Sequence, residues 1–126
     1  MPPEKVEIAR AIRDALLTGG PDAAAEFFHP GVTFEVAVGH FEGIDGMSTW
    51  FQTIAKYLID YEIVETKYMD AGNGVIVNNV MRARGAHTQL ATQDQIYLLH
   101  FQDGKVIRVS RHADEAEALA RAAAEG

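Results

Sequence analysis

The chain changes its hydrophobic periodicity at Asp60, and this change limits the folds that it can adopt. Before Asp60, apolar residues recur mainly at helical spacing, whereas after it they form strand-like runs separated by tight turns. Helices that cluster early and strands that cluster late are typical of an α+β domain with a largely antiparallel sheet. Because 48% of the 126 residues are hydrophobic, we expect one domain with its own core, spanning residues 1–126.

The first part of the chain predicts helices around a single strand. Apolar spacing predicts three helices, at residues 4–17, 21–28 and 47–58. Alternating apolar and polar residues predict a strand over residues 32–38. We expect residues 39–46 to form a loop in which Asp45 caps the following helix.

The second part of the chain predicts four strands and a terminal helix. The strands are expected at residues 61–69, 75–84, 92–101 and 105–111. Hairpin turns are indicated at residues 70–74 and at Asp103-Gly104, and Asp114 is placed to cap a short helix over residues 115–124. A long sheet covered by few helices must curve, so we expect it to wrap around the N-terminal helices as a cone with an internal pocket.

Composition and charge exclude several classes of function. The chain has no cysteine and no closely spaced histidine pair, so we expect no metal site and no cofactor. Its formal net charge of −7 disfavours nucleic acid as a partner. No apolar run is long enough for a membrane span, and no apolar leader stands at the start, which predicts a cytoplasmic protein.

The order of these elements, with the segments FHPGVTFEV, FEGIDGMSTWF and LLHFQDGKVIRVSRHAD, resembles the SnoaL-like family of the nuclear-transport-factor-2-like superfamily. That superfamily includes polyketide cyclases, ketosteroid isomerase and limonene epoxide hydrolase. The resemblance implies an α+β cone whose open-ended pocket takes a small organic molecule. It also implies a homodimer through the outer face of the sheet, for which the expected residues are Met81, Ala83, Ile96 and Leu98.

The resemblance also indicates which side chains line the pocket. Alignment at Gly104-Lys105 places one face of the late strands inside, and the first strand and the third helix complete the lining. The expected lining residues are Phe34, Val36, Trp50, Ile54, Tyr57, Gln93, Gln95, Tyr97, Leu99, Val109 and Arg111. Arg82 is a further candidate whose orientation depends on whether its strand contains a bulge.

The known chemistries of the superfamily do not transfer to these positions. The aspartate base of ketosteroid isomerase aligns with Val36, and the aspartates and arginine of limonene epoxide hydrolase align with Val80, Arg82 and Arg111. No carboxylate is therefore expected on the inner face.

The polar residues that remain favour two kinds of function. Tyr97 and Arg111 could hold a carbonyl, phenolate or carboxylate oxygen, and His40 or His112 at the mouth could act as the base. The first hypothesis is an isomerase, cyclase or dehydratase that uses these residues. The alternative is a non-catalytic ligand-binding or dimerisation module of the same fold.

Overall fold

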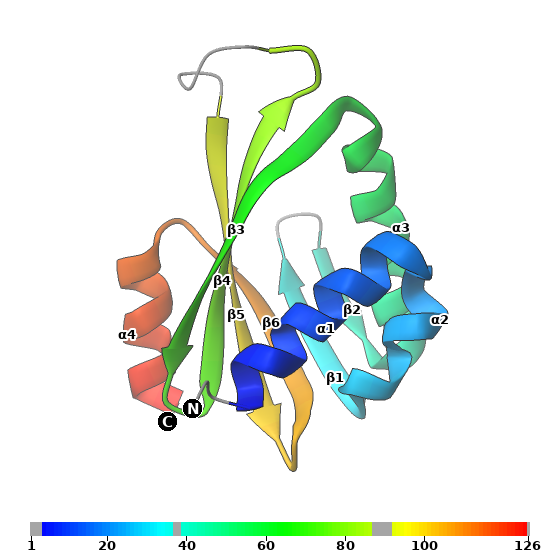
Figure 1. Ribbon diagram of the computed structural model, residues 1–126. Coiled ribbons are helices and arrows are strands. Elements are labelled where there is room, and N and C mark those ends of the chain that lie inside the picture. The colour runs from blue at the N-terminus through cyan, green and yellow to red at the C-terminus, as the bar shows by residue number, and fades with distance from the viewer. Residues whose placement is uncertain (1–3, 37–38, 87–91, 126) are drawn as a thin grey trace.

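The computed structural model describes residues 4–36, 39–86 and 92–125 and has the expected α+β architecture (Figure 1). The helices are α1 (Glu4–Thr18), α2 (Gly20–Ala24), the 3-10 turn η1 (Ala25–Phe27), α3 (Gly43–Asp60) and α4 (Glu115–Glu125). The strands are β1 (Phe28–Val36), β2 (Gly39–Glu42), β3 (Tyr61–Ala71), β4 (Gly74–Ala83), β5 (Thr92–Gln102) and β6 (Lys105–His112). No helix among these residues has both the length and the hydropathy of a membrane span.

Within the described residues the strands form one sheet in the order β2-β1-β6-β5-β4-β3. Neighbouring strands are antiparallel except β1 and β6, which pair in parallel. This parallel pairing places Phe34 of β1 beside Val109 of β6. Side chains that are far apart in the sequence therefore share one face of the sheet.

The turn between β5 and β6 follows the sequence prediction closely. Asp103 and Gly104 have φ angles of 54° and 79°, and they join Gln102 directly to Lys105. Two central residues with positive φ are required by a type I′ hairpin turn, whose twist matches that of the flanking strands. This turn fixes the pairing of the residues next to it, and a bulge between His100 and Phe101 then shifts the register of β5 against β6 by one residue.

Two local predictions in the first part of the chain were wrong. Residues 39–42 form the edge strand β2 and not a loop, because they pair with residues 33–36 of β1. Helix α3 then begins at Gly43, so Asp45 lies inside its first turn instead of capping it. At the other end of the chain the cap was predicted correctly, since Asp114 Oδ1 accepts a hydrogen bond of 2.8 Å from the Glu117 backbone N–H.

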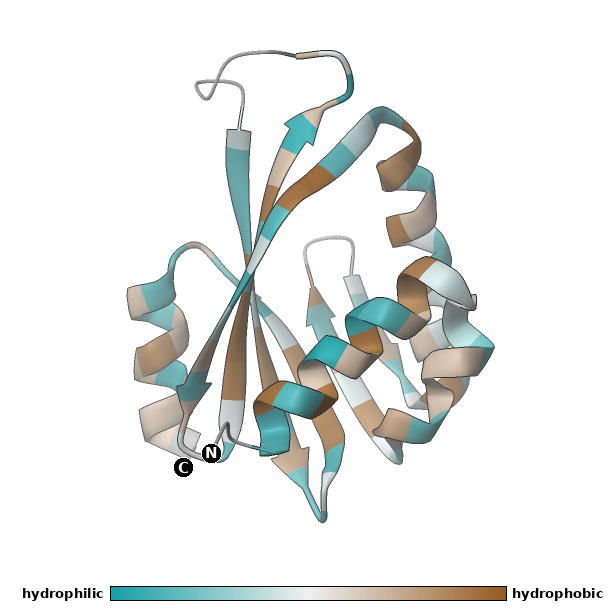
Figure 2. Ribbon diagram, in the orientation of Figure 1, coloured by the Kyte–Doolittle hydropathy of each residue, from teal (hydrophilic) through white to brown (hydrophobic). Residues whose placement is uncertain are grey.

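Helices cover both faces of the sheet. Helices α1 and α3 pack on the face that we call the inner face, and α4 packs on the outer face (Figure 1). The inner core contains fully buried aromatic residues such as Phe34 and Phe51, whereas the outer core is a small cluster beneath α4. Figure 2 shows that the apolar parts of β4 and β5 lie in the region between the helices.

The predicted dimer interface is not exposed. Ile96 and Leu98 do point to the outer face, but α4 covers them, and their exposed fractions are 2% and 1%. Met81 is also buried. It points to the inner face, because residues two apart in a strand share one face and Val77 of the same strand packs in the inner core. Ala83 is half-buried opposite Tyr61 at the end of β4. These four residues therefore do not form an apolar patch on the surface.

We expect Gly74→Ala to lower the free energy of unfolding by about 1–3 kcal/mol, because its new methyl group would overpack the outer core. A Cβ atom at Gly74 would lie 2.7 Å from the Leu99 backbone oxygen and 3.0 Å from Leu98 Cδ1. Urea denaturation measures the loss. The control is Asn73→Ala in the adjoining turn, which is exposed and should change stability by less than about 0.5 kcal/mol. Equal losses in both variants would contradict the prediction.

Candidate functional site

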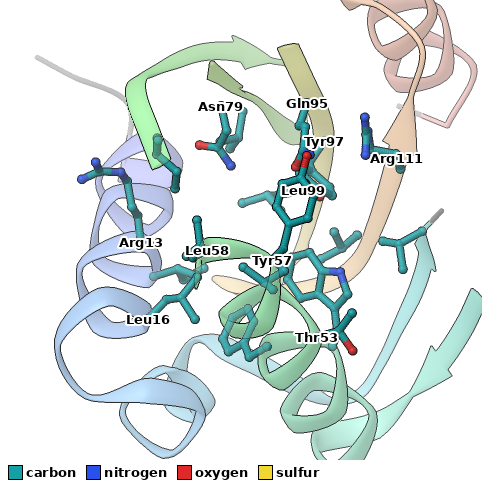
Figure 3. A pocket seen from close by; sticks show the side chains of 18 of the residues that line it. Arg13, Leu16, Thr53, Tyr57, Leu58, Asn79, Gln95, Tyr97, Leu99 and Arg111 are labelled. Atoms are coloured by element: carbon teal, nitrogen blue, oxygen red, sulfur yellow. Dashed lines mark hydrogen bonds between the residues drawn. The ribbon is translucent and has the colours of Figure 1, made fainter. Parts of the chain in front are cut away.

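A pocket of about 270 Å³ lies between α1, α3 and the inner face of the sheet (Figure 3). We call it the main pocket. Most of its lining is apolar, including Ile12, Leu16 and Trp50. The polar or charged side chains among the described lining residues are Arg13, Thr53, Tyr57, Asn79, Gln95, Tyr97 and Arg111. Such a lining suits a small organic molecule held at a few polar points.

Strand register explains how the polar groups come together. Residues directly opposite each other in an antiparallel pair point to the same face. One row across the inner face runs from Tyr68 through Val77 and Tyr97 to Arg111. The neighbouring row contains Thr66, Asn79 and Gln95. The sheet therefore places a band of polar side chains across an otherwise apolar pocket.

Tyr97 and Arg111 form the polar centre of this band. The Arg111 guanidinium carbon lies 5.5 Å from the centroid of the Tyr97 ring, which is a cation–π distance. The Tyr97 hydroxyl donates a long hydrogen bond of 3.4 Å to Gln95 Oε1. Burial raises the pKa of Tyr97 above its usual value of 10.0, although the charge of Arg111 and a hydrogen bond from it act in the opposite direction. The phenol is therefore protonated at neutral pH and acts as a hydrogen-bond donor.

Arg111 lacks a partner for its buried donor. Its Nε atom is shielded from solvent and makes no hydrogen bond in the described structure. Among the described residues, none places a carboxylate within ion-pair distance of this guanidinium. Leaving a buried N–H unsatisfied costs about 1–3 kcal/mol, and more when the group is charged. Arg111 is thus a donor that an oxygen-bearing ligand could satisfy.

A second polar group lies on the opposite side of the main pocket (Figure 3). Arg13 Nε donates a hydrogen bond of 3.0 Å to Thr66 Oγ1, which donates one of 3.0 Å to Asn79 Oδ1. Arg13 and Asn79 both line the main pocket. Because Arg13 and Arg111 flank the same apolar space, the pocket favours negative charge in its occupant.

A tyrosine contact joins α3 to the start of β5. Tyr57 of α3 accepts a short hydrogen bond from Gln93 Nε2 and stacks on Tyr61, with ring centroids 4.4 Å apart. Gln93 itself is exposed. This contact connects the C-terminal part of α3 to the sheet beside the main pocket.

The lining offers no ordinary general base. Among the described residues that line the main pocket, none is an aspartate, a glutamate or a histidine. The described part of the chain also holds no group of three or more histidine and acidic side chains that could bind a metal ion. The polar groups of this pocket can donate hydrogen bonds to an oxygen, but they are poorly suited to remove a proton.

The structure brings most of the predicted site residues together. The main pocket is lined by Val36, Trp50, Ile54, Tyr57, Gln95, Tyr97, Leu99, Val109 and Arg111. Phe34 lies deeper, in the core, where its ring centroid is 5.0 Å from that of Trp50. Gln93 is outside the lining, next to two residues that belong to it: it donates a hydrogen bond to Tyr57 and lies opposite Met81 across the sheet.

Three predicted polar residues lie on the outer face, away from the main pocket. Arg82 is paired with Thr92 and Glu62 across the sheet, and its guanidinium binds Glu62 at 2.8 Å. His40 lies opposite Glu35, with its Nε2 atom 3.1 Å from Glu42 Oε1. His112 is buried beneath α4, where it contacts Ser110 Oγ at 2.7 Å and Glu117 Oε1 at 3.0 Å. Strand register places these side chains outside because neighbouring residues alternate between faces.

Sequence reasoning did not identify several lining residues, among them Arg13, Asn79 and Met81. Asn79 and Met81 were missed because β4 was assigned the opposite facing, so that Val80 and Arg82 seemed to point inward. Arg13 was missed because a charged helical residue is usually solvated. One sequence feature did indicate that Arg13 could reach the pocket. It directly follows Ile12 and comes three residues before Leu16, which places it at the border of the apolar stripe.

Comparisons with known proteins agree with this architecture. The family model described as SnoaL-like domain matches residues 9–109. Among proteins with curated descriptions, none matches the chain.

Three solved structures illustrate the similarity of fold. A nuclear-transport-factor-2-like protein of unknown function from Cytophaga hutchinsonii is 20% identical, with a TM-score of 0.64 and coverage of 90% of this chain and 92% of that one. A candidate polyketide cyclase from Sinorhizobium meliloti is 20% identical, with a TM-score of 0.64 and coverage of 84% and 94%. TerC, co-crystallized with polyporic acid, is 17% identical, with a TM-score of 0.69 and coverage of 91% and 95%. At these identities the likeness concerns the fold alone.

Proposed function

The chain belongs to the family of SnoaL-like domains, and from this premise we propose that its main pocket binds a small, largely apolar organic molecule that carries an anionic oxygen. The apolar side chains of α1 and α3 would surround the body of the molecule. Tyr97 and Arg111 would donate hydrogen bonds to the oxygen. A carbonyl oxygen that becomes negatively charged during a reaction would be bound in the same way.

The unpaired Nε–H of Arg111 is the observation that carries this proposal. A guanidinium beside an apolar pocket is stable only where its charge and its donors find partners. A carboxylate or phenolate could accept from Arg111 and from the adjacent Tyr97 hydroxyl together. The raised pKa of Tyr97 supports this arrangement, because its phenol keeps the proton that it would donate.

Catalysis is the second candidate, and it is favoured by the same pair of donors. Aimed at one oxygen, they would stabilise an enolate formed during isomerisation, cyclisation or dehydration. A candidate polyketide cyclase and a protein co-crystallized with polyporic acid are among the structures of similar fold. Because no described lining residue is a carboxylate or a histidine, the proton acceptor in such a reaction would be water or a basic group of the substrate.

A matched pair of ligands tests the proposal. We expect 2-naphthoate to bind the wild-type protein about tenfold more tightly than 2-naphthamide, because only the carboxylate satisfies Arg111 by a charged hydrogen bond. Isothermal titration calorimetry at constant ionic strength measures both affinities. The two ligands share size and ring system, so their difference reports on charge. Equal affinities, or tighter binding of the amide, would contradict recognition of an anion.

A further inference from the structure

A second hollow of about 220 Å³ lies between α1 and β3, and its lining differs sharply from that of the main pocket. It is lined by Arg10, Arg13, Asp14, Thr66 and Tyr68. We infer that this hollow is a separate binding site for a small carboxylate or phosphate anion, and that its occupant weakens the binding of anionic ligands in the main pocket through Arg13.

The charge of the second hollow favours an anion. Arg10 and Arg13 contribute two positive charges, and Asp14 contributes one negative charge. The Arg10 guanidinium carbon lies 4.6 Å from the centroid of the Tyr68 ring, and no carboxylate of the described residues forms an ion pair with it. Arg13 meets Asp14 only at 3.8 Å. The positive charges of both arginines are therefore poorly neutralised by the carboxylates of the described residues.

Tyr68 adds a third donor to this site. Burial raises the pKa of its hydroxyl above 10.0, although Arg13 and Arg10 act in the opposite direction. The hydroxyl is therefore protonated at neutral pH. Two guanidinium groups and a phenol that share one hollow provide the donors that oxyanions accept in proteins.

Arg13 connects the second hollow to the main pocket because it lines both. Its Nε atom is bonded to Thr66, whose hydroxyl is bonded to Asn79 in the main pocket. An anion beside Arg10 would draw the Arg13 guanidinium away from the main pocket and reduce the positive charge available there. By thermodynamic linkage, an anionic ligand in the main pocket would weaken the second site by the same factor.

Binding at the second site can be tested without any ligand in the main pocket. Sodium phosphate would be titrated into the ¹⁵N-labelled protein while NMR follows the Nε–Hε signals of Arg10 and Arg13, with sodium chloride at matched ionic strength as the reference. We expect saturable shifts with phosphate only, and about tenfold weaker binding in Arg10→Gln. The control is Lys67→Gln, which removes one charge from β3 at an exposed position on the outer face.

Lys67→Gln should bind phosphate like the wild type. Equal weakening in both variants, or equal shifts with chloride, would overturn the site, since either result would indicate non-specific screening.

The coupling rests on the proposed function and is measured separately. Saturating phosphate should weaken 2-naphthoate binding by about fivefold relative to matched chloride, and this effect should be lost in Arg10→Gln and kept in Lys67→Gln. An unchanged naphthoate affinity would overturn the coupling. If naphthoate does not bind at all, the proposed function fails, whereas the phosphate titration still decides whether the second site exists.

Discussion

Replacing Phe34 with alanine is expected to lower the free energy of unfolding by about 3–5 kcal/mol, the range for truncating a fully buried aromatic side chain. Phe34 has no exposed surface, and its ring lies 5.0 Å from that of Trp50 and 5.9 Å from that of Phe28. The substitution would therefore leave a cavity beneath the main pocket. A loss of this size is a large fraction of the stability of an ordinary domain.

The control for Phe34→Ala is Ile59→Ala, a truncation at a side chain that is 70% exposed. It should change stability by less than about 0.5 kcal/mol. Urea denaturation followed by Trp50 fluorescence measures both variants. If Phe34→Ala lost less than about 1 kcal/mol but weakened naphthoate binding, Phe34 would be a lining residue, as the sequence suggested, and the core assignment would be wrong.

The elements with strong periodicity could be predicted from the sequence. The family alignment at Gly104-Lys105 assigned Tyr97, Leu99 and Arg111 to the correct face. The two-residue turn alone would not have done so, because a bulge between His100 and Phe101 shifts the pairing of β5 with β6 by one residue. Strand β2 was missed because a strand of four residues at the sheet edge has too few alternating positions to be recognised.

The facing of β4 could not be predicted reliably from its own residues. Strand β4 is buried on both faces, so Ile76 and Val77 are equally apolar neighbours that point in opposite directions. A shift of one residue exchanges all inward and outward side chains. This single exchange explains why Arg82 was assigned to the pocket and why Asn79 and Met81 were not.

That α4 covers the outer face of the sheet could be recognised only from the structure. Helix α4 is rich in alanine, and Ala118 and Ala122 are its buried residues in the outer core. Its position depends on polar contacts, such as those of Arg121 with Glu35 and of His112 with Glu117. No sequence pattern indicates that these residues meet. The sequence therefore did not show that α4 covers Ile96 and Leu98, and both were assigned to an exposed interface.

Replacing Arg111 with methionine is expected to weaken 2-naphthoate binding by about a hundredfold, which is the cost of removing one partner from a buried, hydrogen-bonded charge pair. Methionine keeps much of the apolar stem and removes the guanidinium. The affinity for neutral 2-naphthamide should change by less than about threefold, because the amide gains little from the charge. Calorimetric titration of both ligands separates the loss of charge recognition from any distortion of the main pocket.

The matched control is Arg82→Met, which makes the same chemical change on the outer face of the same sheet. Arg82 binds Glu62 and does not line the main pocket, so its replacement should leave naphthoate affinity within about twofold of the wild type, as expected for a charge directed away from the site and screened by solvent. Were Arg82→Met to weaken naphthoate as much as Arg111→Met, net charge would control binding and the assignment of Arg111 would fail. A loss in Arg111→Met alone would establish that the Arg111 guanidinium selects the ligand, because the two variants carry the same net charge.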